Sequence, residues 1–121
     1  MDELVRVELH GRKFDVQDGG RAWSCEFEGL DGKIQKRREI KFSQHSCGYL
    51  VFGVSSGGVC RTYYQHELVA LALIGERPSG FDLHHLDEDK TRNYSDNLEY
   101  VEHAEHAREH ALKMGLGRNS R

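Results

Sequence analysis

The chain has 121 residues and a mass of 13.9 kDa, which is enough for one domain around one hydrophobic core. Hydrophobic residues make up 37% and charged residues 31%, and no apolar run approaches the roughly 18 residues that a membrane span needs. The formal net charge of −3 gives no support to nucleic-acid binding, so such a function must rest on local features.

The N-terminus and the cysteines indicate where the protein works. The first residues, MDELVRVELHGRK, contain no apolar stretch of the kind that a secretory signal carries, so we expect no secretion. Cys25, Cys47 and Cys60 are odd in number and widely spaced. This spacing argues against a disulfide framework and against a zinc ribbon built from cysteines, and it favours a reducing compartment.

The first part of the chain is predicted to form β-strands. Residues 5–9, VRVEL, alternate apolar and polar side chains as a half-buried strand does, and residues 21–27 alternate more weakly. Residues 32–43 place isolated apolar side chains among charges, which predicts a solvated hairpin or an edge strand.

A core hairpin and a helix are predicted next. The apolar run at 48–54 predicts a core strand, SSGG at 55–58 predicts a turn, and 59–64 predicts the partner strand. Residues 65–74 are good helix formers, and Gly75 ends this predicted helix.

The last third is predicted to be strand, loop, strand and helix. A loop at 76–80 contains Pro and Gly, and a short strand follows at 81–86. Residues 87–97, DEDKTRNYSDN, are too polar to bury and predict a long hairpin loop. A return strand is predicted at 98–101, and alanine-rich residues 102–115 predict a helix.

Histidines gather in this last third. The chain has eight, and five fall in it: His84, His85, His103, His106 and His110. Neighbouring strand residues point to opposite faces, so the two adjacent strand histidines meet different partners. The pair at 106 and 110 shares one helix face and can chelate a metal ion. For that pair alone, a solvent-exposed face without a ligand is the alternative.

The segment HHLDEDKTRNYSDNLEYVEHAEHAREHA resembles the HNH nuclease motif of phage HNH homing endonucleases. Its matching positions are His84-His85, Asp87, Asn93, Asn97-Leu98, Tyr100 and His106. The stretch YYQHELVALALIGERPSG is similar to the helix that precedes this motif in the family. FDVQDGGRAWS and GYLVFGV resemble, more weakly, the small β module that opens many members, so the likeness covers most of residues 14–116.

The resemblance implies an α+β fold. A small β module is followed by a helix and by the ββα-metal unit, in which a hairpin and a helix hold one metal ion. The expected divisions are an N-terminal β-rich DNA-binding module over 1–64, the helix and nuclease motif over 65–116, and a flexible tail over 117–121. We expect these parts to form one compact unit.

The family's roles carry over by position. His85 matches the general base, which activates a water molecule, and a histidine suits this role because it titrates near neutral pH. His84 and His106 match the metal ligands, and His110 is a further candidate ligand. Asn97 matches the middle letter of the motif, which braces the loop and orients the base. Three residues are expected to be structural near the site: Asp87, Asn93 and His66, the last through a hydrogen bond beneath the hairpin.

The metal is expected to be a single divalent ion. Many phage members have Asp where this chain has His84, and Asn where it has His106. Histidine at both positions resembles the colicin nucleases and favours zinc, nickel or manganese over magnesium. The choice among magnesium, manganese, nickel and zinc stays open.

A basic run and one loop arginine are candidate DNA contacts. The residues are Lys33, Lys36, Arg37, Arg38, Lys41 and Arg92. Taken alone, the run predicts a solvated strand face. In a nuclease, contacts to phosphates are the better interpretation, because such contacts dominate affinity for DNA.

The resemblance therefore predicts a metal-dependent HNH endodeoxyribonuclease of phage or prophage homing type, or a nickase. It would act on double-stranded DNA as a monomer or homodimer in the bacterial cytoplasm, with no membrane partner, and leave 5′-phosphate and 3′-hydroxyl ends. One alternative is a metal-stabilised DNA-binding module without catalysis, although one metal ion does not need both His84 and His85. The other is a phage packaging-associated HNH nickase.

Overall fold

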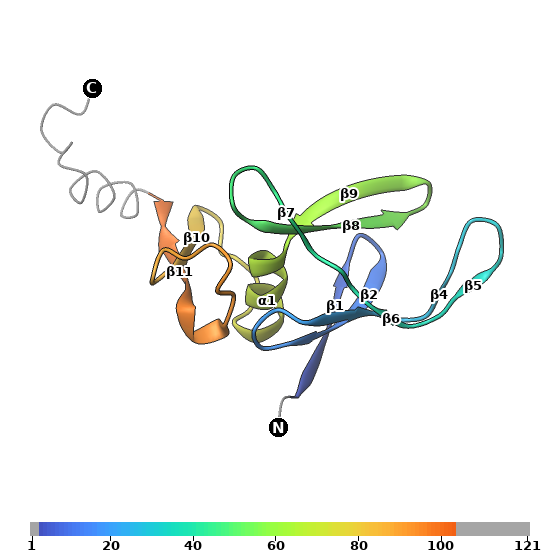
Figure 1. Cartoon of the computed structure of the whole chain (residues 1–121), viewed down its shortest axis with the longest axis horizontal. Coiled ribbons are helices and arrows are strands. Elements are labelled where there is room, and N and C mark those ends of the chain that lie inside the picture. The colour runs from blue at the N-terminus through green and yellow to red at the C-terminus, as the bar shows by residue number, and fades with distance from the viewer. Residues whose placement is uncertain (1–2, 104–121) are drawn as a thin grey trace, which may run out of the picture.

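The computed structural model describes residues 3–103, in which short antiparallel sheets surround one α-helix (Figure 1). A four-stranded sheet in the order β1-β2-β3-β6 opens the fold. Its strands are β1 (Leu4–Leu9), β2 (Arg12–Gln17), β3 (Ala22–Ser24) and β6 (Arg38–Glu39). A tight turn at residues 10–11 joins the first two strands, with positive φ at both positions.

Two further sheets complete the N-terminal half. The hairpin β4 (Phe27–Glu28) and β5 (Ile34–Gln35) projects from the four-stranded sheet, and Figure 1 shows it beside the tip of a second, longer hairpin. That hairpin belongs to the sheet β7-β8-β9, with strands β7 (Ser43–Gln44), β8 (Leu50–Ser56) and β9 (Val59–Tyr64). All of these pairings are antiparallel.

Helix α1 (Gln65–Leu73) follows β9 without a break and lies between the N-terminal sheets and the hairpin of β10 (Phe81–His85) and β11 (Leu98–Glu102) (Figure 1). A short 3-10 helix, η1 (Ser95–Asn97), leads into β11. None of the helices within residues 3–103 is long and apolar enough to cross a membrane.

The hydrophobic core forms where the sheets meet the helix. Its buried members are Phe14, Val16, Ala22, Phe52, Val54, Leu68, Val69, Ala70 and Leu98. They come from β2, β3, β8, α1 and β11, so this single cluster ties the last hairpin to the N-terminal half. Because both halves of the chain contribute to this one core, α1 packs against the N-terminal sheets and against the last hairpin. This packing also fixes the position of the end of β10, which carries the histidines.

Helix α1 ends just before Gly75, as the sequence predicted, and backbone hydrogen bonds close its last turn. Gly75 has φ +130°, a conformation that is costly for other residues, and its N–H donates to Ala70 O over 2.8 Å. Tyr100 from β11 donates its hydroxyl to Gly75 O over 2.8 Å. The end of the helix is therefore held by the β10–β11 hairpin.

Most predicted elements agree with the structure to within a few residues, but two details differ. Strand β2 was not predicted, although Phe14 and Val16 alternate and are 2% and 0% exposed. The region 32–43 is not one hairpin or edge strand. It is divided among β5, β6 and β7, which belong to three different sheets, because each segment pairs with a different partner. The helix predicted at 102–115 begins one residue too early, because Glu102 still belongs to β11, where it pairs with Phe81. The rest of that prediction beyond residue 103, and the tail, lie outside the described residues.

Candidate active site

His84 and His85 end strand β10 and point to opposite faces of the hairpin. His85 pairs with Leu98 across the strands and is buried, with 6% of its surface exposed. His84 pairs with Glu99 and is half-buried. The adjacent histidines therefore serve two different environments, as the sequence predicted from strand geometry.

The buried His85 is held by an amide. Its Nε2 lies 2.6 Å from Asn93 Oδ1, and the Asn93 side chain is completely buried. Asn93 Nδ2 in turn donates to Gln65 Oε1 over 2.6 Å. Within residues 3–103, the other ring nitrogen of His85, Nδ1, has no hydrogen-bond partner. Asn93, rather than Asn97, is thus the residue that contacts the imidazole.

Aromatic rings and a second imidazole pack against His85. The rings of His66 and His85 have centroids 4.9 Å apart, and Tyr49 stacks on His66 at 4.8 Å. His66 Nδ1 is buried without a hydrogen-bond partner in the described structure, so the expected hydrogen bond beneath the hairpin is replaced at this atom by ring stacking. Burial, and then repulsion from His85, lowers the pKa of His66 to about 4.

Asn97 braces the loop rather than touching the His85 ring. Its Nδ2 donates to Asp87 Oδ1 over 2.9 Å and to Arg92 O over 2.8 Å, and its Oδ1 accepts from the Asp87 N–H. Hydrogen bonds from the Asp89 backbone, from Asn97 and from Arg92 lower the pKa of Asp87 to about 2. This closed set of bonds fixes the loop directly after His85.

The loop between β10 and β11 is anchored to the N-terminal half at two points. Asp18, in the turn between β2 and β3, accepts from the N–H and the hydroxyl of Ser95 over 2.7 and 2.8 Å. Lys90 donates to Cys47 O over 2.9 Å. The expectation that this loop is too polar to bury is wrong for Asn93 and Asn97, because hydrogen bonds satisfy both buried amides.

The predicted metal ligands are only partly described. His84 lies on the face of the hairpin opposite His85, and His106 and His110 lie outside the described residues. In the described part of the chain, no three His, Cys, Asp or Glu side chains are grouped as a metal site. His103 Nδ1 lies 2.7 Å from Asp82 Oδ2, so this histidine is paired with a β10 carboxylate.

Two neighbours in the basic run, Arg37 and Arg38, lie against opposite faces of the four-stranded sheet. Arg37 forms an ion pair with Asp15, which also accepts from Arg6, and these bonds lower the pKa of Asp15 to about 2. Arg38 lies in β6 across from Ser24, on the other face. There, a cleft of about 490 Å³ is lined by three cations, Arg12, Arg38 and Lys41.

The other candidate DNA contacts are exposed. Lys33 and Lys36 flank β5 at the projecting hairpin. Arg92 in the hairpin loop forms an exposed ion pair with Asp87 over 2.9 Å. Its guanidinium is therefore held near the end of β10 while remaining open to solvent.

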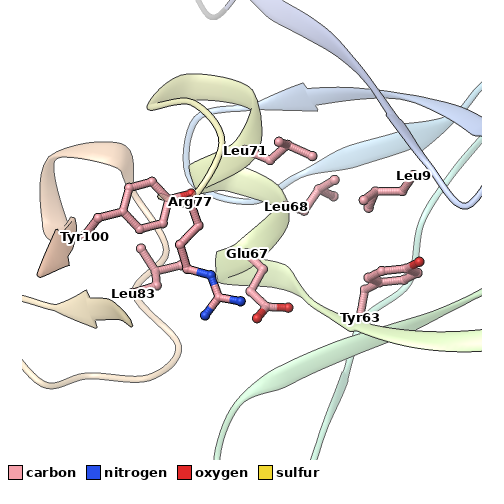
Figure 2. Close-up of a pocket in the computed structure, with 8 residues that line it drawn as sticks. All are labelled: Leu9, Tyr63, Glu67, Leu68, Leu71, Arg77, Leu83 and Tyr100. Carbon is pink, nitrogen blue, oxygen red and sulfur yellow. The ribbon is translucent and has the colours of Figure 1, made fainter. Parts of the chain in front are cut away.

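An apolar pocket of about 210 Å³ lies elsewhere, between α1, the last hairpin and the end of β1. In Figure 2, Leu83 and Tyr100 of the hairpin lie on one side, Leu68 and Leu71 of the helix lie on the other, and the side chains of Arg77 and Glu67 lie between them. Neither His84 nor His85 lines it. The pocket therefore lies apart from the two histidines at the end of β10.

Two residues of the site were missed by sequence reasoning. Gln65 is buried at the first position of α1 and contacts Asn93, and Tyr49 packs on His66. Both come from outside the hairpin, so motif spacing gave no reason to place them there. A polar glutamine at the start of an apolar helix, directly before His66, is the only signal that the sequence offers.

Comparison with known proteins confirms the resemblance. Residues 63–108 match a family model described as HNH endonuclease. A relative from the SPbeta prophage of Bacillus subtilis (strain 168), named as the HNH homing endonuclease YosQ, is 34% identical over 88 residues, which are 72% of this chain and 49% of that protein.

A solved structure is similar as well. It describes DNA binding and cleavage by the HNH homing endonuclease I-HmuI, with a TM-score of 0.64 and 26% identity. The match covers 84% of this chain and 53% of that one, so the chain spans about half the length of both proteins. The predicted α+β fold is confirmed.

Proposed function

We propose that this chain, which belongs to the HNH endonuclease family, hydrolyses phosphodiester bonds in double-stranded DNA. The observation that carries the proposal is the pair at the end of β10. His85 is buried and held at Nε2 by Asn93, while its neighbour His84 faces the other side of the hairpin. A positioned imidazole beside a second imidazole suits a base next to a metal ligand.

His85 acts as the general base in this proposal. Its Nδ1, which has no partner within residues 3–103, takes a proton from a water molecule as the water oxygen attacks phosphorus. The bond from phosphorus to the 3′ oxygen breaks, and that oxygen is protonated by solvent, which leaves 5′-phosphate and 3′-hydroxyl ends. Asn97 supports this role indirectly by fixing the loop that follows His85.

We propose a divalent metal ion on the face that carries His84, whose imidazole suits a transition-metal ion; Asp82 and Glu99 lie on the same face. Because no three His, Cys, Asp or Glu side chains within residues 3–103 are grouped as a metal site, we assign the remaining ligands to the last part of the motif. We propose His84 and His106 as ligands, with His110 as a further one. When bound, the ion would stabilise negative charge on the scissile phosphate and on the leaving oxygen. An all-histidine set favours zinc, nickel or manganese, and magnesium is the alternative.

DNA contacts are proposed on the N-terminal half and on the loop. Arg38 and Lys41 share one cleft with Arg12, and Lys33 and Lys36 extend the basic surface to the β4–β5 hairpin. Arg92 is the candidate contact nearest to His85. Arg37 is engaged by Asp15, so its contribution to DNA binding is expected to be the smallest of the run. We propose residues 1–64 as the DNA-binding module and 65–116 as the nuclease unit.

The biological role is proposed as that of a phage or prophage homing enzyme or nickase acting in the bacterial cytoplasm. One catalytic site cuts one strand, so a monomer nicks and a homodimer could cut both strands. A packaging-associated nickase is the alternative, and site preference separates the two. A homing enzyme cuts at one long site, while a packaging enzyme cuts loosely.

The test is cleavage of supercoiled plasmid by the full chain with magnesium, manganese, nickel or zinc, each against a chelator control. Nicked circles that depend on a metal and carry 5′-phosphates support the proposal. A library of random target sequences replaces the plasmid if the plasmid is not cut. Binding without cleavage of any library member would leave the non-catalytic, metal-stabilised module as the better account.

A further inference from the structure

We infer that the N-terminal sheet sets the tautomer of His85, through a chain of three hydrogen bonds that starts at the backbone carbonyl of Gly20. Gln65 and Asn93 are positioning residues in this chain, and they place the ring proton on Nε2 and leave the lone pair on Nδ1. The inference rests on the proposed role of His85 as the base. It adds which nitrogen acts and what fixes that choice.

The donor-to-acceptor direction along these three hydrogen bonds follows from the first group, the carbonyl of Gly20. A backbone carbonyl oxygen can only accept, so Gln65 Nε2, 3.1 Å away, must be the donor to Gly20 O. This orients the Gln65 amide so that Oε1 faces Asn93 Nδ2, which donates over 2.6 Å. Asn93 Oδ1 therefore faces His85 Nε2, at 2.6 Å, and accepts a proton from it. Only one tautomer of the neutral imidazole satisfies every bond.

Burial makes this order rigid. Gln65, Asn93 and His85 are 7%, 0% and 6% exposed, so water cannot readily replace a mismatched partner. Reversing either amide would leave buried donors facing each other, or buried acceptors facing each other, which is costly. The three hydrogen bonds therefore keep one donor-to-acceptor direction from the N-terminal sheet to the His85 ring.

The β2–β3 turn is shaped to hold Gln65. A Cβ atom on Gly20 would lie 2.5 Å from Gln65 Nε2, and Gly20 has φ +113°, so only glycine fits this approach without a shift. The same turn bonds Ser95 through Asp18 and contacts Tyr94 at Gly19. Three consecutive turn residues thus dock on the helix start and on the hairpin loop that surround His85.

The experiment measures the tautomer directly. In the full chain with ¹⁵N-labelled histidine, long-range ¹H–¹⁵N spectra at a pH where the ring is neutral distinguish a protonated Nε2 from a protonated Nδ1. Wild type is expected to show His85 as the Nε2–H form. In Gln65→Met, the Asn93 amide loses its orienting acceptor and can turn its Nδ2 toward the ring, so both tautomers are expected at comparable levels.

A double variant separates this mechanism from a merely structural role of Gln65. An aspartate at position 93 accepts from the ring whichever way it turns, since an ionised carboxylate has no donor. Gln65→Met/Asn93→Asp is therefore expected to restore the Nε2–H form. The matched control is Gln44→Met, which also removes a glutamine that donates to a glycine carbonyl, Gly48 O, but on the exposed strand β7. Thermal unfolding checks that each variant is folded.

Cleavage kinetics give a second readout. For Gln65→Met we expect kcat to fall about twofold to tenfold, the range that one orienting hydrogen bond supports, with KM unchanged. The double variant should recover part of the loss. A folded Gln65→Met protein that keeps the pure Nε2–H form would overturn the inference. A wild type with the expected tautomers that cuts no target would instead overturn the proposed nuclease function alone.

Discussion

The imidazole rings of His66 and His85 lie 4.9 Å apart, with their planes tilted by 47°. His66 comes from helix α1 and His85 from the end of β10, so this contact joins the helix to the strand that carries the proposed base. Two charged imidazoles at this distance repel each other in a buried site, and repulsion adds to burial in lowering the pKa of His66 to about 4.

This pKa predicts a loss of stability on acidification. His66 titrates near 6.5 when unfolded and about 4 when folded, so the unfolded state binds more protons between these values. The contribution of the neutral His66 to the free energy of unfolding should be fully present above pH 6.5 and should decrease as the pH falls toward 4. The loss from this group is at most about 3 kcal/mol.

The variant His66→Phe isolates the contribution of His66. It keeps an aromatic ring against Tyr49 but does not titrate. Urea unfolding of both proteins across this pH range should show the wild type losing more stability than the variant. Parallel curves would contradict the assignment of the pH dependence to His66.

Removing the side-chain hydrogen bonds of Asn97 is expected to destabilise the loop that follows His85. Asn97→Ala leaves the Arg92 carbonyl and the Asp87 N–H without their partner, and Asn97 itself is 5% exposed. We expect a loss of about 2–3 kcal/mol in the free energy of unfolding, from urea denaturation. Ser95→Ala is the nearby comparison, because it removes only one exposed hydroxyl contact to Asp18 and should cost less than 1 kcal/mol, on the order of one surface hydrogen bond. Equal losses in the two variants would argue against the bracing role.

The three-cation cleft predicts a salt-dependent contribution to DNA binding. Arg38→Ala and Lys41→Ala should each weaken binding and reduce the slope of log K against log salt by about 1, since each removes one of the proposed phosphate contacts. Lys13 lies on the other face of the same sheet, across from Glu8, so Lys13→Ala is the matched control. A slope unchanged by either cleft variant, measured by fluorescence anisotropy, would place the DNA elsewhere.

Much of the fold was predictable because hydrophobic periodicity indicated the strands and the helix, and turn residues indicated where they end. The strand at Val59–Tyr64, the helix from Gln65 and the hairpin around His84 and His85 all followed from local patterns. The segment 32–43 was not resolved correctly, because its short strands are chosen by partners far along the chain. Pairing of Trp23 with Glu39, for example, has no local signal.

The candidate site was predictable only for the residues that belong to the HNH motif. Spacing placed His85 and the loop asparagines together, and the structure adds which asparagine contacts the ring. Gln65 and Gly20 were not predictable, because their role depends on how a turn of the N-terminal sheet docks against α1. Sequence patterns describe one element at a time, while hydrogen bonds between elements depend on the packed fold.

The most direct test of the account compares His85→Ala with wild type in the metal that best supports cleavage, at equal DNA occupancy. His45→Ala is the control, because the ring of this exposed histidine, within residues 3–103, bonds only to Ser46 and Cys47 in its own turn. We expect His85→Ala to lose at least about a hundredfold in kcat, the range typical of a general base, while it binds DNA as wild type does and His45→Ala cuts normally. Cleavage by a folded His85→Ala protein at the wild-type rate would contradict the central claim.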